Sequence, residues 1–322
     1  MALDGTPSSR VSGGPRPLAP SAVAASSAAA VDATSATSAA AVDAMDPGFA
    51  RASGENFPVA LRLLPTSRRQ YLMAVYGFAR TTDDIGDRAP HEQRIRLLDE
   101  LEDDLRSLYA GQSADGGGPK TQVVRALGPA VTDCGIPMQP FADLIQANRQ
   151  DQVVGRYQSF EDLLGYCRLS ANPVGRIVLY VFGCFSERRA ELSDSVCTAL
   201  QLAEHWQDVA EDFRADRIYL PAQDMKEFGC TEEDLSLGTA PPQVRALIAF
   251  ETERATAMLD AGAPLIGTLR GAARVAVAGY VAGGRAALAA IAAAGHDVLR
   301  GTPAPRKQRL AGELLLAYAR GR

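Results

Sequence analysis

The sequence predicts an all-α protein, a helical bundle folded as one domain. From Gly54 onward, apolar residues recur at the three- and four-residue spacing of a helix, and few segments alternate as strands do. The chain has 322 residues, of which 47% are hydrophobic, so it can bury a sizeable core. No internal repeat is visible in the sequence, which disfavours a solenoid of stacked units.

The first 47 residues differ in composition from the rest. Ala, Ser, Pro and Gly dominate them, and large apolar residues are almost absent. Such a segment buries too little surface to offset the entropy of ordering, so we expect residues 1–48 to be a disordered tail and residues 49–322 to form the helical domain. A secretory signal peptide is not expected, because aspartates interrupt the segment and no continuous run of bulky apolar residues occurs.

Helical stretches follow one another along the domain. The first has an apolar face at residues 71–79 and runs toward Asp87, and the second carries the apolar positions of residues 95–108. The Gly-rich segment 111–119 is expected to be a surface loop. Later helices are expected at residues 121–134, 140–154, 160–169, 173–185, 193–213, 242–269, 272–294 and 308–319, and an irregular link is expected to end at Pro221.

The segment 272–294 is apolar enough to suggest a membrane-spanning helix. However, Arg274 and Arg285 lie inside it, and a charged side chain at the centre of a bilayer costs about 2.5–3.5 kcal/mol even on a lenient scale. Many of its other residues are Ala or Gly, which let neighbouring helices approach closely. We therefore expect a buried helix of the bundle.

Composition disfavours several other classes of function. The formal net charge is −5, and no basic stripe with interleaved aromatic residues occurs, so nucleic acid is not an expected partner. The five cysteines are scattered without a CxxC pair, which indicates reduced thiols in a cytoplasm rather than disulfides or a zinc site. The three histidines lack HExxH spacing, which argues against a histidine-ligated metal.

Two acidic segments stand apart, DDIGD at 83–87 and DVAED at 208–212. In each, aspartates at positions i and i+4 of a helix place two carboxylates on one face, one turn apart. Like charges at this spacing destabilise a helix unless a cation lies between them. Magnesium suits the arrangement, because it binds one or two carboxylates and completes its shell with water and phosphate oxygens. Two such helices facing each other across a cavity would hold several ions around one diphosphate.

Either segment alone is more typical of a solvated acidic face, such as the one at residues 99–104. The neighbours of both segments favour a site instead. The first segment follows an apolar helix face with Tyr76 and Arg80, and Arg80 lies one turn before Asp84, where it can meet a phosphate. The second follows QLAEHWQ at 201–207, which is unlike a plain surface helix. Within that run, His205 is more typical of a packed residue than of a catalytic base.

Three runs together resemble the signatures of the squalene/phytoene synthase family. YGFARTTDDIGD at 76–87 is similar to the first aspartate-rich signature, and residues 201–212 with RIYLP at 217–221 are similar to the second. Between them, YCRLSANPVG at 166–175 resembles the central tyrosine–cysteine segment. The runs stand in the family's order and spacing, and the resemblance covers the chain from about Ser53 to the C-terminal helices. It implies an isoprenoid-synthase-type helical bundle with a central cavity, magnesium as cofactor, and a prenyl diphosphate as substrate.

Within that family, ENFPVA at 55–60, NPVG at 172–175 and WQDV at 206–209 resemble the bacterial hydroxysqualene synthase branch of hopanoid biosynthesis. The resemblance implies a carbon–oxygen lyase that converts presqualene diphosphate and water to hydroxysqualene and diphosphate. The alternative is a prenyltransferase that condenses two prenyl diphosphates, such as farnesyl diphosphate, head to head into squalene, dehydrosqualene or phytoene. A non-catalytic relative on the same fold is disfavoured, because both acidic pairs are intact.

The resemblance also implies roles for single residues, position by position. The magnesium ligands would be Asp83, Asp84, Asp87, Glu204, Asp208 and Asp212. The substrate would contact Ser53, Asn56, Phe57, Tyr76, Arg80, Gln201 and Glu204. The catalytic residues would be Asp83, Asp87, Asp208, Asp212 and Tyr166, the last of them beside the diphosphate. Glu204 departs from the family's pattern, which commonly has asparagine there; a glutamate can still bind the metal and adds a negative charge.

The resemblance extends to partners and location. Family members carry a basic group near the C-terminal end that reaches the diphosphate, and Arg300 is the nearest candidate here. A hydrophobic substrate and product are compatible with peripheral contact at the inner face of the membrane, although no amphipathic anchor is obvious. We expect a cytoplasmic protein, whose chemistry is compatible with functional pairing with other enzymes of the squalene pathway.

Overall fold

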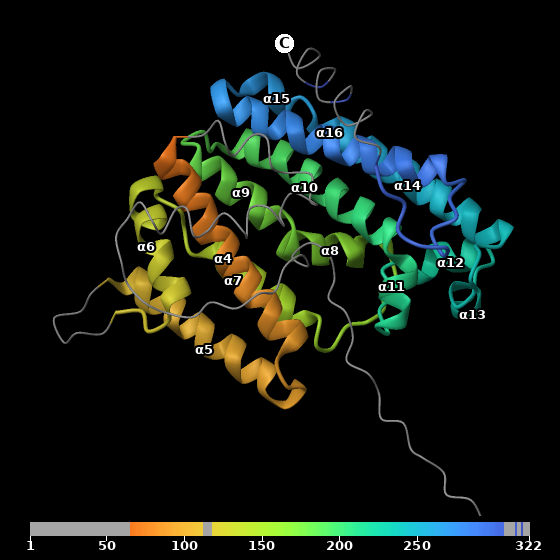
Figure 1. The fold of residues 1–322 in the computed structure, drawn as a ribbon, viewed down its shortest axis with the longest axis horizontal. Coiled ribbons are helices and arrows are strands. Elements are labelled where there is room, and N and C mark those ends of the chain that lie inside the picture. Colours follow the sequence, from red (N-terminus) through yellow and green to blue (C-terminus); the bar gives the residue numbers. More distant parts are fainter. Residues whose placement is uncertain (1–64, 112–117, 306–312, 314–316, 318–322) are drawn as a thin grey trace, which may run out of the picture.

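The computed structural model describes residues 65–111 and 118–305, together with Glu313 and Ala317. In this part of the chain, helices are joined by turns and loops, and the only β pairing is an isolated bridge between two loops. The all-α prediction is confirmed (Figure 1). The expected N-terminal tail lies outside the described residues, and so does the expected helix at 308–319 except for Glu313 and Ala317, which are helical.

One half of the bundle comes from the first part of the domain. Four helices pack on one another around a core that contains Phe78, Leu105 and Phe141, all fully buried. The rings of Phe78 and Phe141 meet edge to face, with centroids 5.3 Å apart. The helices are α4 (Thr66–Arg88), α5 (His91–Ala110), α6 (Gln122–Cys134) and α7 (Gln139–Gln150).

The other half is built around one long central helix, α10 (Glu187–Gln207). It packs against most of the larger helices of this half, and Trp206 near its end is fully buried. The remaining helices are α8 (Phe160–Ser170), α9 (Asn172–Val181), α11 (Val209–Arg214), α12 (Ala222–Glu227), α13 (Glu232–Leu235), α14 (Pro242–Gly262), α15 (Leu265–Thr268) and α16 (Gly271–Ala293). Figure 1 shows α14 and α16 lying along the same side of α10.

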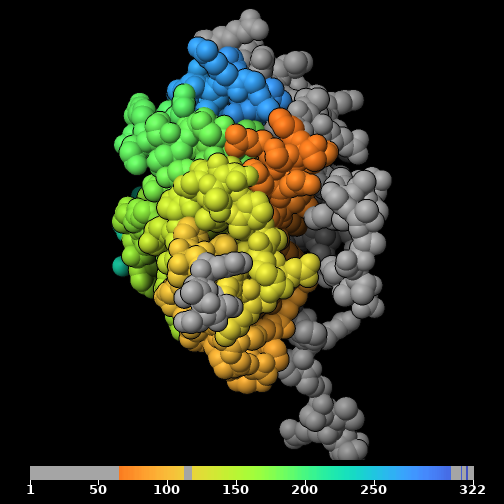
Figure 2. Space-filling view, turned by 90° about the vertical axis from the view of Figure 1, so that its left-hand side faces the viewer, coloured from red at the N-terminus to blue at the C-terminus, as the bar shows by residue number. Residues whose placement is uncertain are grey.

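The two halves meet along α9. Its residues Ile177 and Val181 belong to the core of the first half, whereas Leu179 belongs to the core of the second. Figure 2, which looks at the molecule from the side, shows α15 and α16 (blue) at one end and α5 (orange) at the other. The protein is therefore one bundle with two adjoining apolar cores.

Several predicted helix boundaries were wrong. The predicted helix 193–213 is interrupted at Asp208, between α10 and α11, and the predicted helix 242–269 is interrupted at residues 263–264. Pro264 accounts for the second break, because a proline in a helix interior removes a backbone donor and clashes with the preceding turn. The predicted helix 173–185 ends at Val181 instead, where Gly183 adopts a left-handed φ of 64°.

Two further corrections concern the segments beside the functional site. The predicted helix 140–154 ends at Gln150. The stretch after Pro221, for which the sequence predicted no helix, holds the short helices α12 and α13. Thr231 starts α13 with a capping box. Sequence reasoning missed this signal because the helix is only four residues long and shows no apolar periodicity.

Helix α16 is the expected apolar helix at 272–294. In the described part of the chain it is the one helix that is long and apolar enough to cross a membrane, by length and composition alone. In the structure it packs against α10, α14 and α15, and much of it is buried there. The side chain of Arg285 extends from α16 and pairs with Asp260 on α14, at 2.7 Å. The prediction of a helix packed within the bundle is confirmed.

Candidate active site

The first acidic segment occupies the C-terminal end of α4. There, Asp83 accepts a hydrogen bond from the side-chain amide of Asn148 on α7, at 3.0 Å. Gly86 makes this contact feasible, because a Cβ atom at that position would lie only 2.2 Å from the Oδ1 atom of Asn148. The close approach of α7 to α4 thus holds Asp83 in place.

Asp84 has different surroundings from its neighbour. Its Oδ1 atom lies 3.1 Å from the guanidinium groups of both Arg80 and Arg88, each one helical turn away. Two cations therefore already balance its charge. The structure places Arg80 beside Asp84, as predicted, and this leaves Asp83 and Asp87 as the less neutralised carboxylates of the first segment.

The second acidic segment straddles the break between α10 and α11. Asp208 occupies the junction, with φ −104° and ψ 13°, and the amide of Asp212 still donates to its carbonyl at 2.8 Å. The two aspartates thus remain one turn apart despite the break. The Oδ1 atom of Asp208 accepts a hydrogen bond from the hydroxyl of Thr302, at 2.8 Å, and Asp212 is buried.

The two acidic segments converge through Arg217. Its guanidinium donates to Asp87 at 3.2 Å, and both side chains are 17% exposed. Backbone pairing between two loops sets this geometry: the amide of Ile218 donates to the carbonyl of Gly155, and that of Ala222 to Tyr157, each at 2.9 Å. The loop after α11 therefore runs beside the loop after α7, and it carries Arg217 to the end of α4.

The site is electrostatically strained by its own carboxylates. Burial, and to a lesser degree the charge of neighbouring aspartates, raises the pKa of Asp83 to about 7 and that of Asp212 to about 8. Burial likewise raises the pKa of Asp208 and brings that of Asp151 to about 6, although the charge of Arg217 opposes the shift at Asp151. Such a group of mutually raised carboxylates is typical of a site that binds a cation.

An aromatic cluster adjoins the carboxylates. The ring of Tyr219 stacks on His205, with centroids 3.6 Å apart, and lies 5.7 and 5.8 Å from the rings of Tyr157 and Tyr166. Burial lowers the pKa of His205 to about 3, so its imidazole is neutral at physiological pH. The prediction that His205 is a packed residue agrees with this stacking.

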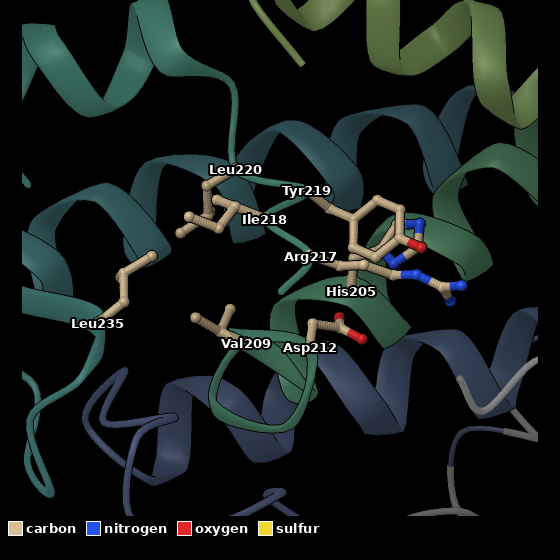
Figure 3. Close-up of a pocket in the computed structure, with 8 residues that line it drawn as sticks. All are labelled: His205, Val209, Asp212, Arg217, Ile218, Tyr219, Leu220 and Leu235. Carbon is tan, nitrogen blue, oxygen red and sulfur yellow. The ribbon is translucent and has the colours of Figure 1, made fainter. Parts of the chain in front are cut away.

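A pocket with a polar and an apolar end lies beneath the loop after α11. Its open volume, part of which is continuous with solvent, is about 190 Å³. Figure 3 shows His205, Asp212, Arg217 and Tyr219 gathered at one end and aliphatic side chains at the other. The aliphatic residues are Val209, Ile218, Leu220 and Leu235.

The structure brings together most of the predicted site residues that it describes. Arg217 pairs with Asp87 and lies within electrostatic reach of Asp212. Asp83 and Asp208 lie one turn before these two aspartates, and Tyr166 lies beside Asp151. Gln201 lies one turn before His205 and contacts its imidazole at 3.2 Å. Tyr76 and Glu204 lie on α4 and α10, each N-terminal to an acidic segment. Ser53, Asn56 and Phe57 lie outside the described residues.

The segment after α16 contains Arg300, the candidate for the basic contact with the diphosphate. Arg300, the expected basic contact, pairs with Asp297 at 3.1 Å and is 71% exposed. It is Thr302 and the carbonyl of Pro303 that reach the second acidic segment, through Asp208 and Gln207. The segment after α16 therefore closes over the break between α10 and α11.

Sequence reasoning missed Asn148 and Asp151. Both lie at the end of α7, where the hydroxyl of Tyr166 donates to Asp151 at 2.9 Å. The signal was weak: an amide and a carboxylate three residues apart, on a helix predicted to continue past them. Because a lone pair of polar residues is common on any surface helix, only the tertiary structure distinguishes these two.

The carboxylates suit a hard divalent cation. Among the described residues, no group of three or more His, Cys, Asp or Glu side chains is placed to hold a metal ion by itself. The carboxylates lie instead as pairs, Asp83 with Asp87 and Asp208 with Asp212. Magnesium accepts this arrangement, since it takes one or two carboxylates and fills its shell with water and phosphate oxygens.

Comparison with known proteins bears on these features. Residues 50–310 match the family model described as squalene/phytoene synthase. A hydroxysqualene synthase of Rhodopseudomonas palustris is 34% identical over 222 residues, which span 67% of this chain and 72% of that protein. A 15-cis-phytoene synthase of Synechococcus elongatus is 31% identical over 214 residues, spanning 62% of this chain and 68% of that protein.

Among solved structures, the squalene synthase HpnC from Alicyclobacillus acidocaldarius has the same fold. It superposes with a TM-score of 0.71 and 41% sequence identity, covering 78% of this chain and 92% of that chain. The matched region of the family model includes both acidic segments and the central tyrosine–cysteine segment.

Proposed function

The chain belongs to the squalene/phytoene synthase family of enzymes, and we propose that it converts presqualene diphosphate and water to hydroxysqualene and diphosphate. The similarity to a protein named hydroxysqualene synthase supports this choice of reaction. The observation that carries the proposal is the convergence of the two acidic segments: Arg217 from the loop after α11 meets Asp87 of α4 at 3.2 Å. A diphosphate bound there lies beside carboxylates of both segments.

Magnesium would be held by Asp83 and Asp87 on one side and by Asp208 and Asp212 on the other. The raised pKa values of Asp83, Asp208 and Asp212 support the assignment, because a cation relieves both the burial cost and the mutual repulsion of the ionised forms. When bound, magnesium supplies positive charge that stabilises the diphosphate as it leaves. Asp84, already paired with Arg80 and Arg88, would act indirectly, and Glu204 would add a ligand beside the second segment.

The protein's own residues would perform the rest of the chemistry. Arg217, and Arg80 with Tyr76, would bind and orient the diphosphate. The carbon–oxygen bond to the diphosphate breaks with both electrons leaving on oxygen. The buried aromatic cluster of Tyr166 and Tyr219 would exclude stray water beside the carboxylates while the carbocation exists. One water adds through its oxygen, the resulting oxonium passes a proton to a second water, and the alcohol is formed.

Head-to-head condensation of two prenyl diphosphates is the second candidate. The similarity to a 15-cis-phytoene synthase favours it, and the identity differs little from that to the hydroxysqualene synthase. Both reactions begin with loss of a diphosphate from a prenyl carbon. The same acidic segments would therefore serve either one, and the product decides between them.

Product analysis tests the proposal directly. Purified protein is incubated with magnesium and without NADPH, in separate reactions with presqualene diphosphate and with farnesyl diphosphate. A C30 alcohol from presqualene diphosphate alone is the expected result. A hydrocarbon, or presqualene diphosphate itself, formed from farnesyl diphosphate would replace the proposal with the condensing reaction. The control is Asp83→Asn, which we expect to be inactive with unchanged helicity; full activity in this variant would contradict the metal assignment.

We further propose a cytoplasmic protein that contacts the inner face of the membrane peripherally. The amphiphilic substrate and the hydrocarbon-like product support this location, because both partition into lipid. Functional pairing with other squalene-pathway enzymes would spare the substrate a passage through water. Recovery of the protein in the soluble and membrane fractions of its host, with and without high salt, tests the contact.

A further inference from the structure

Asp151 follows α7 and lies where the two halves of the bundle meet. Its amide donates to the carbonyl of Ala147 at 3.0 Å, so the last turn of α7 fixes its backbone. A few residues later, Gly155 pairs with Ile218 in the loop that carries Arg217. The fold thus places Asp151 beside the first acidic segment, the central tyrosine and the loop after α11.

The two oxygens of Asp151 have unequal surroundings. Oδ2 accepts a hydrogen bond from the hydroxyl of Tyr166, at 2.9 Å. Oδ1 is buried, and among the described residues it has no hydrogen-bond partner. The carboxylate also lies within electrostatic reach of Asp83, Asp87 and Asp212, and burial raises its pKa to about 6.

Such a carboxylate is costly for the fold. A buried charge with an unpaired oxygen and like charges nearby destabilises the native state, and an apolar residue of similar size would relieve the cost. The favourable charge near Asp151 is the guanidinium of Arg217. Residues that keep an unfavourable charge of this kind are concentrated at functional sites.

Arg217 and the proposed magnesium would share the same partner, the carboxylate of Asp87. In the structure Arg217 donates to Asp87, at 3.2 Å. Under the proposed function Asp87 binds magnesium, so its oxygens become shared with the metal. Asp151 is not assigned to the metal, so its carboxylate stays available to attract the guanidinium of Arg217.

We propose that Asp151 is a positioning residue of the active site, which orients the hydroxyl of Tyr166 and holds Arg217 in place for the diphosphate. This inference rests on the proposed function. It extends the site by the residue that caps α7, and it makes Arg217 a diphosphate contact whose charge interacts with Asp151 as well as with Asp87.

Calorimetric binding of inorganic diphosphate in the presence of magnesium tests the role without requiring turnover. We expect Asp151→Asn to weaken this binding about tenfold or more, because Arg217 is no longer held. If Asp151 were only a negative charge near the site, its removal would strengthen binding of the anion. Asp151→Glu keeps the charge and is expected to bind within about threefold of the wild type. The matched control is Asp143→Asn, whose carboxylate lies on the same helix but accepts from Gln139.

Kinetics with presqualene diphosphate complete the test. We expect Asp151→Asn to lower kcat roughly 100-fold. In a Tyr166→Phe background it should lower kcat less than about threefold further, because residues that act as a unit are not additive. Unchanged or tighter diphosphate binding, multiplicative losses of kcat, or failure of Asp151→Asn to fold would each overturn the assignment. A wild type that binds diphosphate but turns over neither prenyl substrate would refute the proposed function alone, and the binding ratio would still decide Asp151.

Discussion

The pKa of Asp212 reflects the burial and the charges of the whole site. The side chain is 6% exposed, and burial raises its pKa to about 8, with further contributions from Asp208 and an opposing one from Arg217. Without a cation the group is mostly protonated at neutral pH. Magnesium between the two acidic segments would favour the ionised form, so the raised pKa and the proposed metal site are two aspects of one arrangement.

The sign of the resulting pH dependence follows from linkage. The folded state binds the proton of Asp212 more tightly than the unfolded chain, whose aspartate has a pKa near 4. The stabilising effect of that proton is therefore fully present below about pH 4 and is lost as pH rises through 8. In metal-free buffer, Asp212→Asn should be more stable than the wild type at pH 9, by about 2 kcal/mol or roughly 4–8 °C in Tm, and the difference should vanish near pH 4.

Thermal denaturation from pH 4 to pH 9 measures this difference. Glu211→Gln is the control, because Glu211 is the exposed neighbour and its substitution should leave Tm nearly unchanged at every pH. Equal Tm values for Asp212→Asn and the wild type across the whole range would show that burial does not raise the pKa as described.

The sequence indicated the four aspartates of the proposed metal site because their i, i+4 spacing repeats in two runs that resemble known signatures. It did not predict Asn148 or Asp151, because each stands alone, and its role comes from a helix that packs against α4 and from a loop paired with a distant loop. Spacing along the chain shows which carboxylates share a face, whereas tertiary contacts decide which residue lies opposite them.

At the scale of elements, the approach of α7 to α4 depends on Gly86. The position is buried, and any side chain there would meet Asn148, the residue that donates to Asp83. Gly77 lies earlier on the same helix, where a Cβ atom would have its nearest neighbour, Val123, at 4.0 Å. Substitution of either glycine by alanine therefore adds the same methyl group, at Gly86 against a residue of the site and at Gly77 in open space.

We expect Gly86→Ala to destabilise the protein by about 1–3 kcal/mol and to reduce kcat at least tenfold, because the added methyl group displaces Asn148 and frees Asp83. Gly77→Ala should instead stabilise the protein by about 0.5–1 kcal/mol, since alanine is the better helix former. Denaturant unfolding and steady-state kinetics of both variants measure these effects. Normal kcat in Gly86→Ala would mean that the contact between Asn148 and Asp83 is dispensable.

Helix existence was easier to predict than helix ends. Long amphipathic runs such as those of α4 and α5 carry the periodic signal many times over, so their presence was correctly expected. The break at Asp208 leaves the helical periodicity intact, because the hydrogen bond from Asp212 to Asp208 preserves the turn. Only the backbone geometry shows that the second acidic segment lies at a junction of two helices.

At the scale of the molecule, the site lies at the meeting of the two halves. Asp83 and Asp87 belong to the half formed by α4 to α7, whereas Asp208 and Asp212 belong to the half built around α10. In the described residues, the link across the acidic segments is the single contact of Arg217 with Asp87. A ligand held by both segments therefore adds contacts between the halves that the protein alone does not make.

Binding across this boundary should stabilise the whole fold. A ligand that binds only the folded state at 100 times its Kd adds about 2.7 kcal/mol, which corresponds to a rise in Tm of roughly 5–11 °C for a chain of this size. We expect magnesium with inorganic diphosphate to produce such a rise, and either component alone to produce much less, because each needs the other to satisfy carboxylates and phosphate oxygens together. Differential scanning calorimetry of the wild type and of Asp208→Asn measures it, the variant being expected to lose most of the rise. An equal rise in Tm in both proteins would mean that the ligand binds to one half only. The boundary between the halves would then not be the binding site.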